Sequence, residues 1–169
     1  MDKVNWKFDN TYSKLSKSFR ELIKPTPVHN PEIIIFNHQL AKDLNLDFSK
    51  LSNEELSNIF SGNDLPKETK TLAQAYAGHQ FGHFTMLGDG RAVLLGEHLD
   101  NKKNRYDIQF KGSGRTSFSR GGDGRAALGP MLREYIISEA INSLNIPTTR
   151  SLAVVKSGEK VVREHLLEG

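Results

Sequence analysis

The sequence of 169 residues contains no cysteine. This absence excludes disulfide bonds, zinc sites with thiolate ligands and cysteine nucleophiles. The chain also has no apolar run long enough to span a bilayer, and Met1–Trp6 shows no apolar stretch of the kind found in signal peptides. We therefore expect a cytoplasmic protein without membrane contact.

Several common active-site signatures are missing as well. The sequence has no G-x-x-x-x-G-K-[ST] loop and no G-x-S-x-G turn, which excludes P-loop NTPases and the usual hydrolase elbow. Gly88 and Gly90 supply the first two glycines of G-x-G-x-x-G, but the next is Gly96, too late for that pattern. A dinucleotide-binding Rossmann unit is therefore excluded, and the kinase glycine loop is matched only in part.

The composition is that of a globular domain with a sizeable core, at 37% hydrophobic and 25% charged residues. The net charge is +3, and the basic excess is local: residues 102–133 carry eight cations and two acids. Such a segment could bind nucleotide phosphates or nucleic acid. Because only Tyr106, Phe110 and Phe118 could stack on bases there, a phosphate-bearing small molecule is the favoured ligand and nucleic acid is not expected.

The pentapeptide Gly-Asp-Gly-Arg-Ala occurs twice, at 88–92 and at 122–126, with Lys111 between the copies. Glycines let the backbone approach a ligand and present N–H groups to an anion. Arginine and lysine add charge-assisted donors for phosphate oxygens. The repeat therefore predicts a nucleotide phosphate site.

The local patterns predict an α+β fold. Asn37 is expected to cap a helix to about Leu44, and Ser52 with Glu55 forms a capping box for another. Residues 105–111 alternate, which places Lys111 opposite the apolar face at the end of a strand. The remaining expected elements are at most one short helix near 12–22, a strand or extended segment at 32–36, strands at 85–87 and 92–97, a helix at 71–78, and a hairpin of 151–155 with 160–163.

A helix from Pro130 to about Leu144 has apolar residues over more than half its circumference, which predicts that it is largely buried. Glu134 projects near Ile137 and Ile141, so we expect it to have a cationic partner. Glu139 is the rival for that role. His79 and His83 have zincin-like spacing, but Gln80 replaces the catalytic glutamate of that motif, so no metal site is predicted.

The order of these elements is that of a protein-kinase N-lobe: a glycine turn, a strand ending in lysine, then a helix whose glutamate holds that lysine. The predicted fold is thus an antiparallel sheet with a packed αC-type helix, preceded by an N-terminal helical or irregular extension. We expect residues 1–31 to form this arm and 32–169 the lobe.

Five motifs in this order resemble the selenoprotein O family (SelO/YdiU) of kinase-fold protein adenylyltransferases. They are Gly78-His79-Gln80-Phe81-Gly82, Leu87-Gly88-Asp89-Gly90-Arg91, Phe110-Lys111-Gly112-Ser113-Gly114, Gly122-Asp123-Gly124-Arg125-Ala126 and Ile146-Pro147-Thr148-Thr149-Arg150. The resemblance implies transfer of AMP from ATP, with Mg²⁺ or Mn²⁺, to Ser, Thr or Tyr hydroxyls of proteins.

The resemblance also assigns roles to residues of this chain. Gly88, Gly90 and Arg91 would contact the nucleotide, Lys111 would hold phosphates, and Glu134 would orient Lys111. Asp123 and Gly124 would contact the base or ribose region.

The family's catalytic aspartate, its metal ligands and two further nucleotide-contacting arginines have no counterpart here. We therefore expect a C-lobe to be absent and this chain alone to be inactive. We also expect an apolar patch on the side of the Lys111 strand and the last hairpin. The alternative is a stand-alone, non-enzymatic nucleotide- or RNA-binding module.

Overall fold

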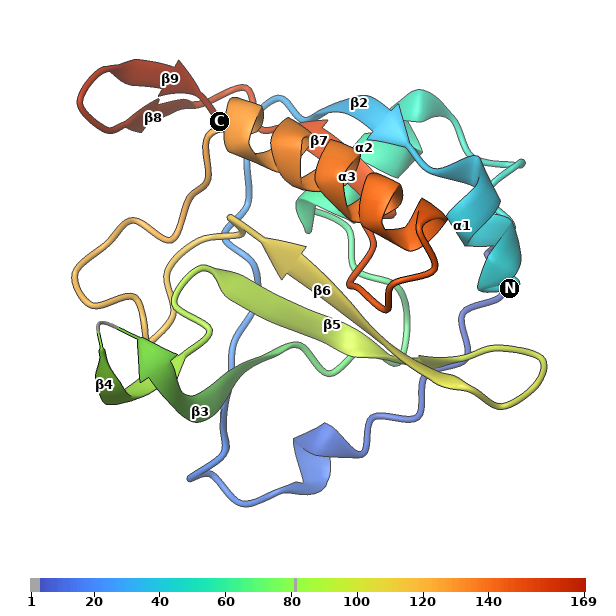
Figure 1. Cartoon of the computed structure of the whole chain (residues 1–169). Helices are drawn as coiled ribbons and strands as arrows, with labels where there is room; N and C mark the ends of the chain where they lie inside the picture. The colour runs from blue at the N-terminus through green and yellow to red at the C-terminus, as the bar shows by residue number, and fades with distance from the viewer. Residues whose placement is uncertain (1–3, 81) are drawn as a thin grey trace. The chain divides into compact units, whose positions relative to one another are not determined.

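The computed structural model describes residues 4–80 and 82–169, so Met1–Lys3 and Phe81 of the Gly78–Gly82 motif lie outside it. The described part is an α+β structure with antiparallel sheets, as predicted (Figure 1). It divides into two compact units, one of residues 4–5, 28–64 and 126–169 (unit 1) and one of residues 6–27 and 65–125 (unit 2). No helix in the described part is long and apolar enough to cross a membrane.

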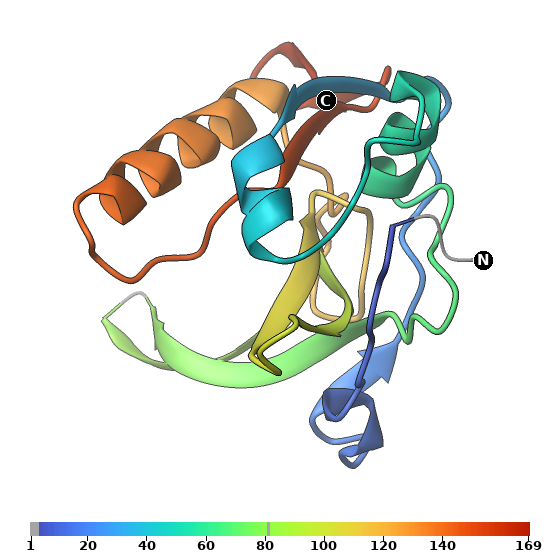
Figure 2. The same cartoon turned by 90° about the vertical axis from the view of Figure 1, so that its right-hand side faces the viewer.

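Unit 2 is built on one sheet whose described strands follow the order β1-β3-β5-β6, with β4 paired to β3. Its elements are a 3₁₀ turn at Tyr12–Lys14, β1 (Arg20–Leu22), β3 (Leu72–Gln80), β4 (His83–Gly88), β5 (Ala92–Leu99) and β6 (Arg105–Lys111). Strands β5 and β6 form the long antiparallel pair in Figures 1 and 2. The largest fully buried side chains of the described residues all belong to this unit: Leu72, Val93, Leu94, Leu95 and His98.

The segment before the 3₁₀ turn lies along β5. The N–H of Asp9 donates to the carbonyl of Glu97, and the N–H of Leu99 donates to the carbonyl of Lys7, both at 2.9 Å. The buried carboxylate of Glu97 accepts from the Thr11 hydroxyl at 2.6 Å and from the Tyr12 N–H at 2.7 Å. The N-terminal segment is therefore fixed to the sheet.

Unit 1 pairs distant strands. Its elements are β2 (Glu32–Phe36), α1 (His38–Asp43), α2 (Asn53–Ser61), α3 (Leu128–Ser143), β7 (Ala153–Lys156), β8 (Lys160–Val162) and β9 (Leu166–Glu168). Strand β2 pairs antiparallel with β7, and this pair lies between α3 and α2 (Figures 1 and 2). The aromatic rings of Phe36, Phe48 and Phe60 meet at centroid distances of 5.1–5.6 Å, with Phe48 buried and the other two half-buried.

Two of the three helix starts predicted in unit 1 are confirmed, whereas the third helix, α3, begins at Leu128, two residues before the expected Pro130. The Asn37 side chain accepts from the Leu40 N–H, and Ser52 and Glu55 form a reciprocal capping box. Helix α2 ends at Gly62, whose φ of 84° is the left-handed conformation that favours glycine at a helix end.

Three sequence predictions are wrong. Residues 71–78 are not a helix but most of β3, because they pair with β1 on one edge and with β4 on the other. Residues 151–155 and 160–163 do not form a hairpin, since β7 pairs with β2 and β8 with β9. The helix expected at 130–144 is present as α3, but none of its residues, all of them described, is buried. A turn signal and an apolar pattern do not specify which distant segment becomes the partner.

Candidate functional site

The first glycine turn joins β4 to β5 and is held by Asp89. The carboxylate oxygen Oδ2 of Asp89 accepts from the Gln74 N–H at 2.9 Å and from Gln109 Nε2 at 3.1 Å. The side chain is only 6% exposed, and this burial raises the pKa of Asp89, while the two hydrogen bonds oppose the rise. Asp89 therefore ties the turn to β3 and β6, a role that sequence reasoning missed.

The loop after β6 packs onto this turn. The Thr116 hydroxyl donates to the Asp89 carbonyl at 2.6 Å, and the Ser119 hydroxyl donates to the Gly90 carbonyl at 2.6 Å. A Cβ on Gly90 would lie 2.7 Å from the carbonyl oxygen of Phe118, and one on Gly88 would overlap the Phe118 ring. Glycine is thus required at both positions by the close approach of the loop.

The second copy of the pentapeptide meets the start of the same loop. The N–H of Gly114 donates to the Gly124 carbonyl at 3.1 Å, and a Cβ on Gly124 would overlap the Gly114 carbonyl. Asp123 is exposed and its Oδ1 accepts from the Arg125 N–H at 2.9 Å. The Arg125 guanidinium donates to the carbonyls of Thr26 and Pro27 at 3.2 Å each. The guanidinium of Arg125 therefore anchors the loop to the N-terminal segment of unit 2.

Lys111 ends β6 beside both turns. It lies opposite Ala92 in the β5–β6 register, and the N–H of the next residue, Gly112, donates to the Arg91 carbonyl at 2.6 Å. The side chains of Lys111 and Arg91 are both exposed. Unit 2 thus brings Gly88, Gly90, Arg91 and Lys111 to one end of its sheet, with Asp123 and the buried Gly124 on the adjoining loop.

Glu134 and Glu139, the two rival carboxylates, are in different surroundings on α3. Both oxygens of Glu139 accept from Arg150, from Nε at 2.9 Å and from Nη2 at 2.7 Å. Arg150 is the main cause of the lowered pKa of Glu139. Glu134 is exposed. The Lys111–Glu134 contact would join residues of the two units and stays a prediction.

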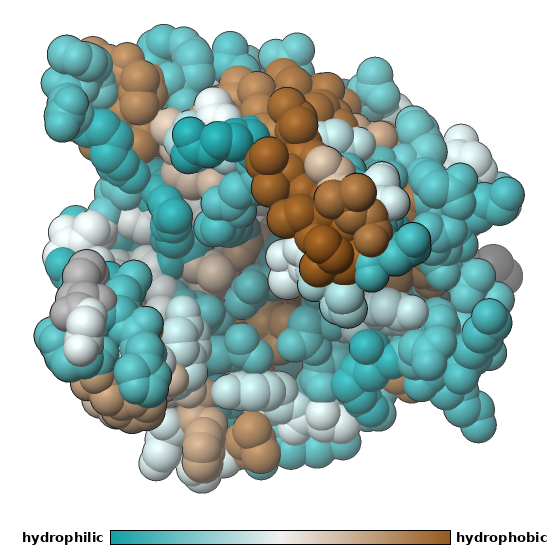
Figure 3. Space-filling view, in the orientation of Figure 1, coloured by the Kyte–Doolittle hydropathy of each residue, from teal (hydrophilic) through white to brown (hydrophobic). Residues whose placement is uncertain are grey.

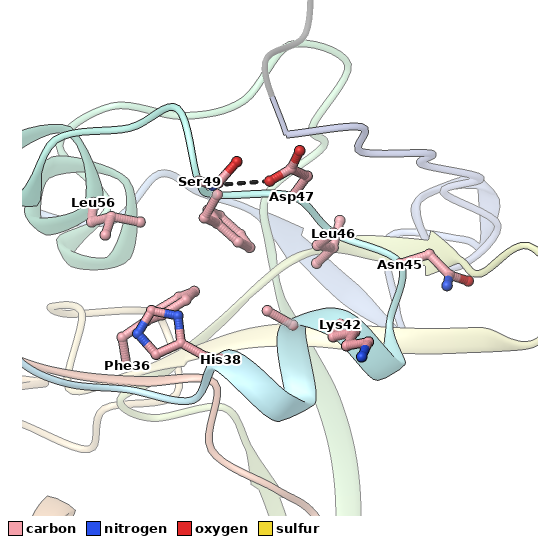
Figure 4. A pocket seen from close by; sticks show the side chains of 10 residues that line it. Phe36, His38, Lys42, Asn45, Leu46, Asp47, Ser49 and Leu56 are labelled. Atoms are coloured by element: carbon pink, nitrogen blue, oxygen red, sulfur yellow. Dashed lines mark hydrogen bonds between the residues drawn. The ribbon is translucent and has the colours of Figure 1, made fainter.

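Unit 1 contains a pocket that sequence reasoning did not anticipate (Figure 4). It has a volume of about 610 Å³, with Phe36, Phe48 and Leu56 among its apolar walls. His38, Lys42 and Asp47 are on its polar rim, and Asp47 accepts from the Ser49 N–H at 2.9 Å. The described residues that line it include none of the predicted nucleotide-site residues.

The described residues provide no cluster of three His, Asp or Glu side chains that could hold a metal ion. His79 and His83 lie on β3 and β4 rather than on a helix, and the His79 ring packs edge-on against Phe84 at 5.3 Å. Of the acids near the glycine turns, Asp89 is already engaged by Gln74 and Gln109. The donor set of these residues therefore does not fit a Mg²⁺ or Mn²⁺ site.

Comparison with known proteins gives the family. The profile of the family described as protein adenylyltransferase SelO matches residues 2–166. The chain is 67% identical over 166 residues to the protein nucleotidyltransferase YdiU of Pelagibacter ubique, covering 98% of this chain and 34% of that protein. It is 62% identical to the protein of that name from Anoxybacillus flavithermus, covering 98% and 35%. It is 60% identical to the protein of that name from Nitrosococcus oceani, and the match covers 98% of this chain and 34% of that protein.

The chain therefore belongs to the protein nucleotidyltransferases, and within them to the SelO protein adenylyltransferase family. This confirms the resemblance drawn from the five motifs. The chain spans about a third of the length of the curated relatives it matches, at 34–35%.

Proposed function

We propose that this chain is the nucleotide-binding, N-terminal part of a protein adenylyltransferase, with a kinase-like N-lobe arrangement. The observation that carries the proposal is the convergence in unit 2 of both glycine turns on the end of β6, where Lys111 and Arg91 are exposed. Membership of a family described as protein adenylyltransferases supports ATP as the nucleotide and protein hydroxyls as acceptors.

The proposed site acts by positioning and charge. Gly88 and Gly90 let the nucleotide approach the backbone, while Lys111 and Arg91 donate to phosphate oxygens. Asp123 accepts from hydroxyl or amino groups of the ribose or base, and Gly124, which packs against Gly114 at the start of the loop, lies beside it toward the same region of the nucleotide. Glu134 orients the ammonium of Lys111. Fixed donors of this kind stabilise charge that develops on phosphate oxygens without reorganising during the reaction.

Transfer of AMP by this chain alone is not expected. In nucleotide and phosphate transfer, metal ions are usually bound by carboxylates together with phosphate oxygens. The described residues do not supply such a cluster. We therefore propose AMP transfer, protein substrates and a bound metal for full-length proteins of the family, and not for this chain alone.

A titration with ATP tests the nucleotide site. Lys111→Ala should weaken ATP binding at least about tenfold, equivalent to about 1.4 kcal/mol, because it removes a cation from the phosphates. Lys102→Ala is the matched control: Lys102 is also exposed and in unit 2, but lies in the turn after β5. Equal affinities of the two variants would contradict the proposal.

A second titration, with single-stranded RNA at two salt concentrations, tests the alternative. Tight binding with a steep salt dependence, unaffected by Lys111→Ala but reduced by substitution of the loop arginines, would indicate a nucleic-acid-binding module instead.

A further inference from the structure

Helix α3 carries an apolar surface that the described structure leaves exposed. Ile136 and Ile137 of the helix are 62% and 52% exposed, its C-cap residue Leu144 is 69% exposed, and Ile146, two residues further on, is 52% exposed. Ile137, Ala140 and Leu144 follow the three- and four-residue spacing of one helix face. We call the following five residues the α3 stripe: Ile136, Ile137, Ala140, Leu144 and Ile146. Figure 3 shows hydrophobic residues gathered over this helix.

The stripe faces outward because the helix is held on another side. At 3.6 residues per turn, Glu139 projects about 160° from Ile137 and about 60° from Ile136, which is outside the arc of the stripe. Glu139 is fixed there by the two hydrogen bonds from Arg150. Arg150 also contacts Asp43 of α1, with Nη1 3.5 Å from Oδ2. The rotation of α3 about its axis is thereby set, and the stripe is a defined surface rather than a frayed end.

We propose that the α3 stripe is a docking surface. Its occupant is the region of the longer family proteins, about two thirds of their length, that this chain does not match. In the Pelagibacter ubique relative, the matched region is 34% of the length, so most of that protein has no counterpart here. Soluble proteins rarely leave a contiguous apolar patch uncovered. Apolar anchors repeated along one helix face fit a groove or a second helix.

The charges around the stripe suit an apolar interface with a polar edge. Arg133 and Glu134 are exposed on α3, where they can form the rim, while the centre is made of isoleucine, alanine and leucine. Interfaces of this type exclude charge from the core and place it at the rim. The proposal rests on family membership and on this surface, and does not depend on nucleotide binding.

Cysteine labelling can test the proposal because the chain has no cysteine of its own. Ile137→Cys or Leu144→Cys is introduced into this chain and into a full-length chimera in which the chain replaces the matched region of the Pelagibacter ubique relative. Met86→Cys, on β4 and 76% exposed in the wild type, is the control. The rate of thiol modification at each introduced cysteine is followed by peptide mass spectrometry.

In the chain alone, all three cysteines should react quickly. In the chimera, Ile137→Cys and Leu144→Cys should react at least about tenfold more slowly, whereas Met86→Cys should keep its rate. Equal rates at α3 in the chain and the chimera, with circular dichroism showing both folded, would overturn the proposal. Concentration-dependent protection at α3 in the chain alone, with a dimer in sedimentation, would instead identify a second copy as the occupant.

Hydrogen exchange tests the same proposal without introduced cysteines, by comparing the chain with the chimera. Amides of α3 should exchange more slowly in the chimera than in the chain. ATP affinity is measured separately on the same samples, so failure of docking and failure of nucleotide binding are distinguishable.

Discussion

Arg150 clamps Glu139 with two hydrogen bonds, Nε to Oε1 at 2.9 Å and Nη2 to Oε2 at 2.7 Å. Both side chains are largely shielded, at 19% and 25% exposed. Because Arg150 follows α3 in the chain and also contacts Asp43, the clamp joins α3 to α1. The interaction assigns Glu139 a structural role and leaves Glu134 as the candidate for the proposed site.

Replacing Arg150 should destabilise the protein in a pH-dependent way. Arg150→Met should lower the free energy of unfolding by about 1–2 kcal/mol at pH 7, since two charge-assisted hydrogen bonds are lost from a partly exposed pair. The folded-state pKa of Glu139 is lowered, so this stabilisation is present above the ordinary glutamate pKa and is lost as the pH falls through the folded value. The unfolding free energies of wild type and variant, measured in urea, should therefore converge only as the pH falls through the folded-state pKa of Glu139, which lies below the ordinary glutamate value of about 4.3.

Arg133→Met is the control for that experiment, because Arg133 is an exposed arginine of the same helix. It should leave the unfolding free energy nearly unchanged. If the difference in unfolding free energy between wild type and Arg150→Met stays constant down to pH 3, the clamp does not contribute through ionisation of Glu139.

The two helix glutamates should separate stability from binding. Glu139→Gln should lower the melting temperature, because Arg150 loses its charged partner, with ATP affinity unchanged at temperatures where the protein is folded. Glu134→Gln should weaken ATP binding without lowering the melting temperature. Calorimetry on both variants checks this, and the reverse pattern would assign Glu139 to the nucleotide site.

Asp89 should tolerate loss of charge but not loss of its oxygen. Asp89→Asn keeps an acceptor for the Gln74 N–H and removes a buried charge, so its stability at pH 7 should lie within about 0.5 kcal/mol of wild type or above it. Asp89→Ala leaves a buried donor unpaired and should cost about 1–3 kcal/mol.

The pH dependence at Asp89 has the opposite sign from that at Glu139. Its folded-state pKa is raised by burial, so the folded state binds more protons, and the contribution of Asp89 to stability decreases as the pH rises through the ordinary aspartate value toward the raised one. Asp89→Asn should remove this decrease. Denaturant unfolding between pH 4 and pH 7 would reveal whether wild type and variant differ in slope.

Local signals are sufficient for some elements and insufficient for others. The caps at Asn37 and Ser52 and the alternation of residues 105–111 act over a few residues, so the sequence pattern predicts them correctly. Residues 71–78 include three alanines, which favour helix, but pairing with β1 and β4 overrides that preference. Partner choice between distant strands, as for β7 with β2, has no local signature.

The candidate site is also predictable only where its residues carry a local sequence signal. The repeated pentapeptide points to the two turns, and the structure brings both to the end of β6. The structural role of Asp89 has a weaker signal, an acid between two glycines after a strand, which is typical of a turn-fixing side chain. The Glu139–Arg150 pair is not predictable, because it depends on how the chain returns after α3.

Substitution by alanine should have opposite effects on stability at two glycines, Gly124 and Gly129. Gly124 has a φ of 69° and no room for a Cβ beside Gly114, so Gly124→Ala should cost more than about 2 kcal/mol. Gly129 lies in α3, and a Cβ added there would meet no atom within 4 Å, so Gly129→Ala should be neutral or stabilise by up to about 1 kcal/mol. Thermal unfolding of the two variants is the measurement.

The pairing of β2 with β7 also sets an order of events during synthesis. Strand β2 carries three consecutive isoleucines, and its partner begins at Ala153. At about 5–20 residues per second, a ribosome needs roughly 6–24 s to make the roughly 120 residues between the two strands. For that interval the isoleucine run lacks its partner strand β7, and an unpaired apolar strand is the kind of segment that pairs with other chains. The growing polypeptide is therefore most exposed to aggregation through β2 before β7 leaves the ribosome.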